Sequence, residues 1–154
     1  MSDSNPIRRN FERVPPSVVS AARLFQASIL ADVGGRRGTM HGRIQPLSKT
    51  MKVAGPAFTV EVRPGDNLMI HKALDLAAPG DVIVVDGGGD LTNALIGELM
   101  IAHAVNRRIA GIVIDGAIRD SAYVRAGSFP VFAAGVTHRG PYKDGPGEIN
   151  APIA

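Results

Sequence analysis

The chain has 154 residues, a length typical of one domain rather than two. Hydrophobic residues make up 45% and charged residues 20%, which excludes general disorder. Because the sequence contains no cysteine, disulfides, thiolate zinc sites, iron–sulfur clusters and a cysteine nucleophile are excluded. A formal charge of only +3 and an aromatic content of 5% argue against a nucleic-acid partner. They are compatible with an ordinary solvated surface or with small anionic substrates.

Residues 1–15 are polar and are expected to form a lead-in to a domain that covers residues 16–154. They contain no apolar core of the kind that a secretory signal peptide needs. No later segment reaches the roughly 18 consecutive apolar residues of a membrane-spanning helix. We therefore expect a soluble, cytoplasmic protein with no membrane partner.

The first half of the domain shows three patterns in chain order. Apolar residues at helical spacing predict a helix over 17–33, with Ser17 as its N-cap and Gly34 at its end. Alternation over 51–63 predicts one or two short strands. The next pattern predicts a helix over 67–77.

The second half alternates between buried-strand and helix patterns. Strands are predicted over 81–86, 109–115 and 129–133, and helices over 91–106, capped by Asp90 or Thr92, and over 121–126. A strand, a crossover helix and a second strand at this spacing form a right-handed βαβ unit. The predicted fold class is α/β.

Two of the predicted strands end in loops that carry acidic residues. Asp86 is followed by three glycines and Asp90, and Asp115 is followed by a segment that ends in Arg119 and Asp120. In parallel sheets, ligands bind where the carboxyl ends of the strands meet. The glycine run lacks both nucleotide-binding spacings and its acidic neighbours would repel a pyrophosphate, which favours a plain tight turn.

The adjacent pair Arg119 and Asp120 suggests more specific chemistry. An arginine can bind the carboxylate of an α-keto acid through two parallel hydrogen bonds, and an aspartate is an oxygen ligand suited to Mg²⁺ or Mn²⁺. A local salt bridge or a capping pair would explain the same residues. Asp32 and Asp86 are further candidates for a pocket rim. We assign no ligand role to the histidines, which are His41, His71, His103 and His138.

The blocks VVDGGG and DGAIRD, together with ADVGGRRGTMHGRIQPL upstream, resemble one known family. It includes the ribonuclease-activity regulator RraA and the 4-hydroxy-4-methyl-2-oxoglutarate/4-carboxy-4-hydroxy-2-oxoadipate aldolases. The similarity runs over about residues 18–149. The family's marker is an acidic residue, twenty intervening residues and then Arg-Asp, and here it is formed by Glu98, Arg119 and Asp120.

This resemblance implies both a fold and an activity. The implied fold is an RraA-like α/β/β sandwich, related to swivelling phosphohistidine domains, in a single layered domain with βαβ units. The implied assembly is a ring-shaped homo-oligomer, a trimer or a hexamer. The implied activity is that of a divalent-metal-dependent pyruvate aldolase with oxaloacetate decarboxylase activity. Both reactions would pass through a pyruvate enolate stabilised by Mg²⁺ or Mn²⁺.

The resemblance also assigns roles to particular residues. Arg119 would bind the oxygen of the α-keto acid substrate, and Asp120 would ligate the metal. Glu98 would hold metal-bound water, although the aldolases have an aspartate at its place. Backbone N–H groups for the substrate carboxylate would come from Gly97, Glu98, Leu99 and Met100.

Two further expectations follow from the same resemblance. The alternative function is a regulator without catalysis, which binds a ribonuclease through protein contacts. Family members usually continue beyond the point where this sequence stops, at Ala154. We therefore expect a domain that is short at its C-terminus, with a strand left open at one edge of the sheet.

Overall fold

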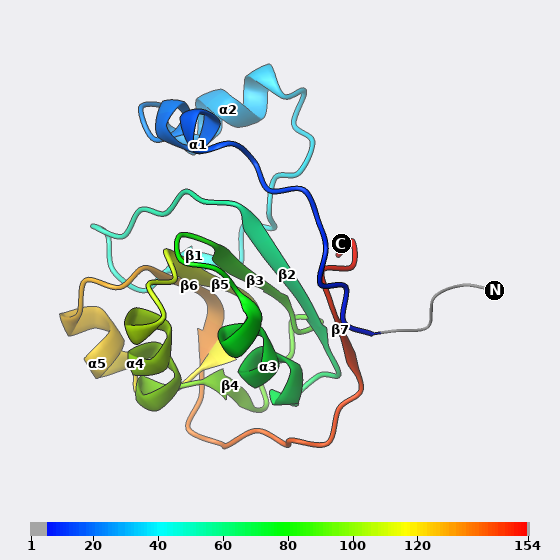
Figure 1. The fold of residues 1–154 in the computed structure, drawn as a ribbon. Coiled ribbons are helices and arrows are strands. Elements are labelled where there is room, and N and C mark those ends of the chain that lie inside the picture. The colour runs from blue at the N-terminus through cyan, green and yellow to red at the C-terminus, as the bar shows by residue number, and fades with distance from the viewer. Residues whose placement is uncertain (1–5, 154) are drawn as a thin grey trace.

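A mixed β-sheet runs through the part of the chain that the structure, a computed structural model, describes, which is residues 6–153 (Figure 1). The strands are β1 (Gln45–Pro46), β2 (Ala57–Val62), β3 (Val82–Asp86), β4 (Ala94–Ile96), β5 (Gly111–Ile118), β6 (Val131–Val136) and β7 (Gly147–Ile149). The helices are α1 (Pro16–Ala22), α2 (Ala27–Val33), α3 (Leu68–Leu76), α4 (Glu98–Asn106) and α5 (Ser121–Ala126).

The centre of the sheet is parallel and its edges are antiparallel. Its order is β1-β6-β5-β3-β2-β7, with β4 paired to the end of β5. Strands β3 and β5 are parallel neighbours in the register Val82↔Gly111 to Asp86↔Asp115. The predicted βαβ unit is therefore present, and the prediction of a single α/β domain is confirmed. Strand β5 pairs with β3, β4 and β6 and so joins the two halves of the sheet.

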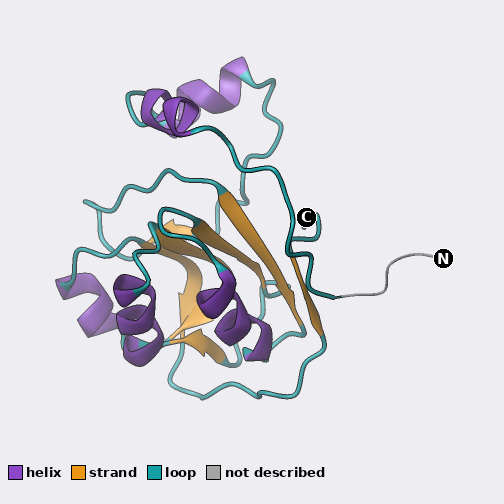
Figure 2. Ribbon diagram, viewed as in Figure 1, coloured by secondary structure: helices purple, strands orange, loops and turns teal. Residues whose placement is uncertain are grey.

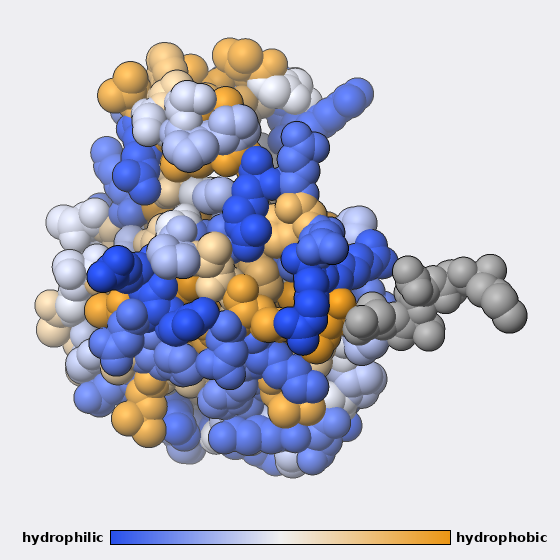
Figure 3. Space-filling model, viewed as in Figure 1, coloured by the Kyte–Doolittle hydropathy of each residue, from blue (hydrophilic) through white to orange (hydrophobic). Residues whose placement is uncertain are grey.

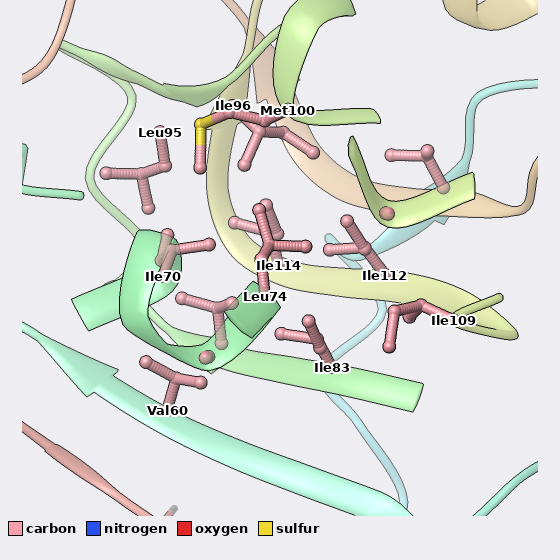
Figure 4. Close-up of a cluster of buried hydrophobic side chains, with 14 of the residues drawn as sticks. Val60, Ile70, Leu74, Ile83, Leu95, Ile96, Met100, Ile109, Ile112 and Ile114 are labelled. Carbon is pink, nitrogen blue, oxygen red and sulfur yellow. The ribbon is translucent and has the colours of Figure 1, made fainter. Parts of the chain in front are cut away.

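Helices α3, α4 and α5 form a layer on one side of the sheet (Figure 2). The core between them is formed largely by branched aliphatic side chains from the strands, with Ile70 and Leu74 from α3 and Met100 from α4 (Figure 4). The side chains of Ile70 and Leu74 are fully buried, and each such burial contributes about 1.5–3 kcal/mol. Within residues 6–153, no helix is long and apolar enough to span a membrane.

The predicted helix over 91–106 is wrong in its first half. Residues Ala94–Ile96 form β4, and the helix begins only at Glu98. A short apolar run fits a buried strand as well as a helix, and these three residues are all buried against β5. The carboxylate of Asp90 accepts the N–H of Asn93 at 3.3 Å and so caps a turn before β4. As a result, Gly97 lies at a strand-to-helix junction.

The predicted helix over 17–33 is broken into α1 and α2. Leu24 and Phe25 donate their N–H groups back to the end of α1, which turns the chain before α2. Ser17 is inside α1, and Pro15 occupies the N-cap position. Neither helix buries a residue, and Leu24 is 82% exposed. The pair lies apart from the sheet, with apolar side chains on its surface (Figure 3).

The described part of the N-terminal lead-in packs against the sheet, while residues 1–5 lie outside the described part. Ile7 forms a parallel bridge with Ile149 on β7, which covers part of that sheet edge. Arg13 binds the buried carboxylate of Asp81 with its Nε 3.0 Å from Oδ1 and its Nη2 2.9 Å from Oδ2. Hydrogen bonding to Asp81 raises the pKa of Arg13. The lead-in is thus held in place by specific contacts.

Candidate active site

The first acidic strand end, after β3, is closed by contacts within the chain. Gly87 and Gly89 each donate an N–H to the carbonyl oxygen of Asp115 at 3.1 Å. The guanidinium of Arg43 binds the carboxylate of Asp115 through Nε at 2.7 Å and Nη2 at 2.6 Å. These hydrogen bonds lower the pKa of Asp115, and its charge is neutralised locally. The glycine run is the tight turn that the sequence favoured.

The second acidic strand end lies further along β5. Three residues of β5 follow Asp115, and at about 3.3 Å each they carry the chain roughly 10 Å further before Arg119. Strand β4 pairs with these residues in place of β3. The sequence predicts that the two acidic strand ends meet at one edge of the sheet, and this is wrong for Asp115, which does not lie with Glu98 and Asp120. Among residues 6–153, no group of three or more metal-binding side chains gathers at any place.

Asp120 connects the end of β5 to the beginning of α4. Its backbone is left-handed, with φ 54° and ψ 37°, a conformation that costs about 1–3 kcal/mol outside glycine. Its Oδ2 accepts the N–H of Glu98 at 2.9 Å and lies 3.7 Å from Nε of Arg119. The side chains of Arg119 and Asp120 remain 46% and 41% exposed, so both can still reach a ligand.

Gly97 permits this close approach. A Cβ at position 97 would collide with the carboxylate of Asp120 and lie 2.9 Å from Cγ of Arg119. The backbone of Gly97 is extended, so space rather than conformation requires a glycine here. The absence of a side chain lets Arg119 and Asp120 lie against the N-terminus of α4.

The N-terminus of α4 retains two N–H groups that could bind a ligand. The first N–H groups of a helix have no partner inside the helix. The N–H of Glu98 is bound by Asp120, whereas those of Leu99 and Met100 have no acceptor within the described residues. The Glu98 side chain is exposed and makes no ion pair with any described residue. The family resemblance implies four backbone N–H donors for the substrate carboxylate, and that of Glu98 is therefore already hydrogen-bonded to Asp120.

A pocket of about 120 Å³ opens at this helix terminus. It is lined by four of the expected site residues, which are Gly97, Leu99, Met100 and Arg119. Glu98 and Asp120 flank these residues in sequence but are not part of the lining. A larger hollow of about 200 Å³ between α4 and α5 is lined by Val105, Tyr123 and their neighbours. Because that hollow contains no charged side chain, the smaller pocket is the better candidate for chemistry.

The same pocket contains residues that the sequence did not indicate: Asn67, His71 and Lys143. The sequence analysis assigned His71 no ligand role, but its Nε2 is buried without a partner among the described residues. Asn67 lies at the N-terminal end of α3 and has an unpartnered Oδ1. No local pattern marks Lys143, because a distant segment brings it to the pocket.

The remaining candidates lie elsewhere. Asp32 is on α2 and does not line the pocket, and Asp86 binds the N–H of Gly88 at 3.0 Å in the closed strand end. The Nδ1 of His41 accepts the N–H of Arg43, and Nε2 of His103 lies 3.4 Å from Asp75. The second strand end, with Arg119 and Asp120, is therefore the candidate site.

Comparison with known proteins identifies relatives across most of the chain. The sequence profile of the RraA-like family, described as Aldolase/RraA, matches residues 16–154. A Halalkalibacterium halodurans protein, provisionally named a 4-hydroxy-4-methyl-2-oxoglutarate aldolase, is 40% identical over 136 residues, or 88% of this chain and 65% of that protein. The 4-hydroxy-4-methyl-2-oxoglutarate aldolase of Thermus thermophilus is 35% identical over 102 residues, or 66% of this chain and 62% of that protein.

Solved structures share the fold. The RNA-processing inhibitor RraA from Thermus thermophilis matches with a TM-score of 0.75 and 28% sequence identity, over 84% of this chain and 78% of that one. The chain spans slightly less than two thirds of the length of the two sequence relatives. The likeness therefore covers the sheet and the pocket but not the whole of those proteins.

Proposed function

Because the chain belongs to the RraA-like (Aldolase/RraA) family, we propose that it is a divalent-metal-dependent carbon–carbon lyase acting on small α-keto acids. In this proposal it is a pyruvate aldolase of the 4-hydroxy-4-methyl-2-oxoglutarate type that also decarboxylates oxaloacetate. The names of its sequence relatives support the aldolase part of the proposal. The residues that line the pocket, and Glu98 and Asp120 beside it, support the rest.

One observation carries the proposal. Within the described residues, Arg119 and the unpaired N–H groups of Leu99 and Met100 lie at one pocket, beside the carboxylate of Asp120, which no arginine binds through two hydrogen bonds. The N–H groups of Leu99 and Met100 suit the carboxylate of an α-keto acid. Arg119 would then face the 2-oxo oxygen. In retro-aldol cleavage, the 4-hydroxyl of the substrate loses its proton to solvent and becomes the carbonyl of the released product, while the electron pair of the broken C–C bond is delocalised onto the 2-oxo oxygen and leaves the pyruvate enolate. A fixed cation at that position stabilises the developing charge.

The residues present fit a hard divalent ion. Mg²⁺ and Mn²⁺ accept one or two carboxylates and keep several waters, and Asp120 offers one partly exposed carboxylate. Glu98, whose side chain has no ion pair among the described residues, would hold a metal-bound water. The bound ion would act as a Lewis acid on the keto oxygen. The sequence has no cysteine and residues 6–153 contain no histidine cluster, so the donor set favours Mg²⁺ or Mn²⁺ over Zn²⁺.

Oxaloacetate decarboxylation tests this function. The purified protein should release CO₂ and pyruvate from oxaloacetate in the presence of Mg²⁺, lose this activity in EDTA and regain it with excess Mg²⁺. Arg43→Lys, at the closed strand end, serves as the matched control for Arg119→Lys. Turnover no faster than the metal-catalysed background in solution would contradict the proposal.

We also propose that the protein acts as a homo-oligomer, a trimer or a hexamer. The exposed apolar residues of α1, α2 and the turn between them support this, since Leu24 in the turn is 82% exposed and Val33 at the end of α2 is 85% exposed. Contiguous exposed apolar surface commonly marks a protein interface. Light scattering at micromolar concentration should give three or six times the mass of one chain. A monomer would contradict the assembly but not the pocket chemistry.

The alternative function is regulation of a ribonuclease by protein binding. The structural match to an RNA-processing inhibitor favours it. A regulator of this kind would bind the ribonuclease through its surface and would not need the guanidinium of Arg119 in the pocket. If the Arg119→Lys variant inhibits a ribonuclease as well as wild type does, and neither protein turns over oxaloacetate, the regulator function replaces the lyase.

A further inference from the structure

The N-terminal lead-in pairs with the edge strand β7 as a short additional strand. The carbonyl of Pro6 accepts the N–H of Ile149 at 2.7 Å, and the N–H of Arg8 donates to the carbonyl of Ile149 at 3.1 Å. These two bonds flank the parallel bridge of Ile7 with Ile149, and Figure 1 shows the lead-in running beside β7. Asn150 Nδ2 donates to the carbonyl of Arg8 at 2.8 Å. The lead-in therefore satisfies backbone groups that an edge strand otherwise presents to solvent or to another chain.

Side chains tie the same segment, residues 6–13, which we call the strap, to the rest of the domain. The ring of Phe11 meets that of Phe58 on β2 edge-on, with centroids 5.8 Å apart. The guanidinium of Arg13 lies over the Phe11 ring at 4.4 Å and binds both oxygens of Asp81. Because Asp81 is only 1% exposed, its charge needs this cation. The strap thus docks through a backbone bridge, an aromatic ring and an arginine fork, and any copy of the same segment can make these contacts.

The next part of the chain, residues 16–33 with α1 and α2, is held much more loosely, and we call it the arm. Neither helix buries a residue, and Figure 2 shows the pair standing clear of the sheet and its helical layer. Nη2 of Arg23 donates to the carbonyl of Ala54 at 3.1 Å in an exposed contact. Moving the arm away from its own sheet therefore breaks few contacts beyond those of the strap.

An exposed hinge joins the arm to the rest of the domain. Residues 34–43 are all exposed, and four of the ten are glycine. A Cβ at Gly35 or Gly38, whose φ angles are 67° and 70°, would meet no described atom within 4 Å, so the hinge is not packed at these positions. The far end of the hinge is fixed by the fork from Arg43 to Asp115. The strap and the arm can therefore change direction together while the sheet keeps its structure.

Resting on the homo-oligomer proposed above, we propose that the strap and the arm are exchanged between copies of this chain. The strap of one copy docks on β7 of a second copy and makes there the contacts that it makes here within one chain. Exchange of an identical element between protomers is a low-cost route to an oligomer, because each broken contact is replaced by an identical one. The occupant is a second copy because the docking site matches this segment of the same sequence.

Exposed apolar side chains on the arm favour the exchanged form. Leu24, Phe25 and Val33 are 82%, 54% and 85% exposed in the single chain. An arm that reaches across to a second copy places these side chains against protein instead of water, and burial of apolar surface drives association. The exchanged assembly therefore gains burial that the single chain lacks, while the strap keeps its full set of contacts.

Cross-linking between the strap and β7 distinguishes exchange from docking within one chain. Nη2 of Arg8 on the strap lies 3.9 Å from Oε2 of Glu148 on β7 in an exposed pair, and such pairs contribute little to stability. Because the sequence contains no cysteine, the variant Arg8→Cys/Glu148→Cys has only these two thiols. After reaction with a short bis-maleimide, exchange gives covalent products of two or more chains on a denaturing gel, and their share rises with protein concentration. Docking within one chain gives internally linked single chains and overturns the exchange.

Two single variants provide the matched control. A chain with Arg8→Cys and a chain with Glu148→Cys, co-expressed in one cell, should be linked to each other. In the control, Lys49→Cys replaces Arg8→Cys. Lys49 is exposed in the loop after β1, at the opposite edge of the sheet from β7, and its variant should give no link to Glu148→Cys. Equal linking with Lys49→Cys and with Arg8→Cys would show random contact and overturn the exchange.

Light scattering on the same samples separates this inference from the assembly on which it rests. An oligomer whose chains are all linked internally overturns the exchange and keeps the assembly. A monomer with internal links overturns both, and links between the chains of an oligomer support both. The lyase is measured separately with oxaloacetate, so its failure would leave the exchange standing.

Discussion

The two acidic strand ends look alike in sequence and differ in structure. Each follows a buried parallel strand and combines aspartates with glycine or other small residues. At the end of β3, Asp86 binds the N–H of Gly88, and Arg43 forms a two-pronged ion pair with Asp115, which lies beside Asp86 on the neighbouring strand β5. After β5, Asp120 has a backbone N–H and an arginine 3.7 Å away, and the pocket opens beside them.

This difference shows what distinguishes a structural carboxylate from one that is free to act. A carboxylate with a fixed arginine partner has its charge compensated before any ligand arrives. Asp120 instead uses one oxygen to hold the N-terminus of α4 and remains partly exposed. We therefore expect substitutions after β5 to change activity and those after β3 to change stability.

The largest expected effect is at Arg119. Arg119→Lys keeps the charge but loses the planar pair of donors, and kcat/KM for oxaloacetate should fall by about 100-fold or more. The same change at Arg43 should alter kcat/KM less than about threefold, because that side chain does not line the pocket. Steady-state kinetics of both variants makes the comparison. Near wild-type turnover for Arg119→Lys would refute its role.

Asp66 is a third carboxylate, and like Asp115 it is bound by groups of the same chain. Burial alone would raise the pKa of Asp66, but N–H donors from Leu68, Asp144 and Gly145, with Arg63, outweigh burial and lower it below 3.8. Asp66→Asn should reduce the free energy of unfolding by about 2 kcal/mol at pH 7.

The pH dependence of this loss follows from the direction of the shift. A carboxyl with a lowered folded-state pKa stabilises the fold fully above its unfolded pKa, and this contribution is lost as pH falls through the folded pKa. The difference between wild type and Asp66→Asn in urea unfolding should therefore shrink below about pH 4. A difference that stays constant down to pH 2 would show that the charge of Asp66 is not involved.

Gly97→Ala tests the close approach at the open end. The added methyl group would displace the side chains of Asp120 and Arg119, so kcat/KM should fall about tenfold with a small change in stability. Gly42→Ala is the matched control, because a Cβ there meets no atom within 4 Å. Equal activity of the two variants would show that the contact at position 97 is not needed.

The smallest expected effect is at the closed end. Arg43→Met removes a partly exposed ion pair and should lower the free energy of unfolding only slightly, less than Asp66→Asn does. Thermal or urea unfolding measures this loss. Activity per folded molecule should stay near wild type, and a loss as large as that of Arg119→Lys would erase the distinction between the two ends.

Much of the sheet could be predicted because its signals are local. Continuous β-branched runs marked β3 and β5, and helical spacing marked α3. The family resemblance, through its marker of Glu98, Arg119 and Asp120, pointed to the open end, and in the structure the Glu98 N–H is bound by Asp120 beside Arg119. β4 was missed because a three-residue apolar run does not distinguish strand from helix.

The contacts that separate the two strand ends could not be predicted from local pattern. Arg43 and Asp115 are 72 residues apart in sequence. Lys143 is held at the pocket by a hydrogen bond from the N–H of the next residue, Asp144, to the carboxylate of Asp66, 78 residues away in sequence. Which carboxylate receives a distant cation depends on tertiary structure and not on the residues beside it.

The most direct test of the central claim, that the strand end after β5 is open to ligands, is calorimetric titration of Mn²⁺ in the presence of pyruvate. Asp120→Asn is the sharpest variant, because asparagine tolerates the left-handed backbone and its Oδ1 can still accept the Glu98 N–H. Wild type should bind the ion, and Asp120→Asn should bind it at least about tenfold more weakly with an unchanged melting temperature. If both proteins bind Mn²⁺ alike, Asp120 is not the metal ligand and the account of this site is wrong.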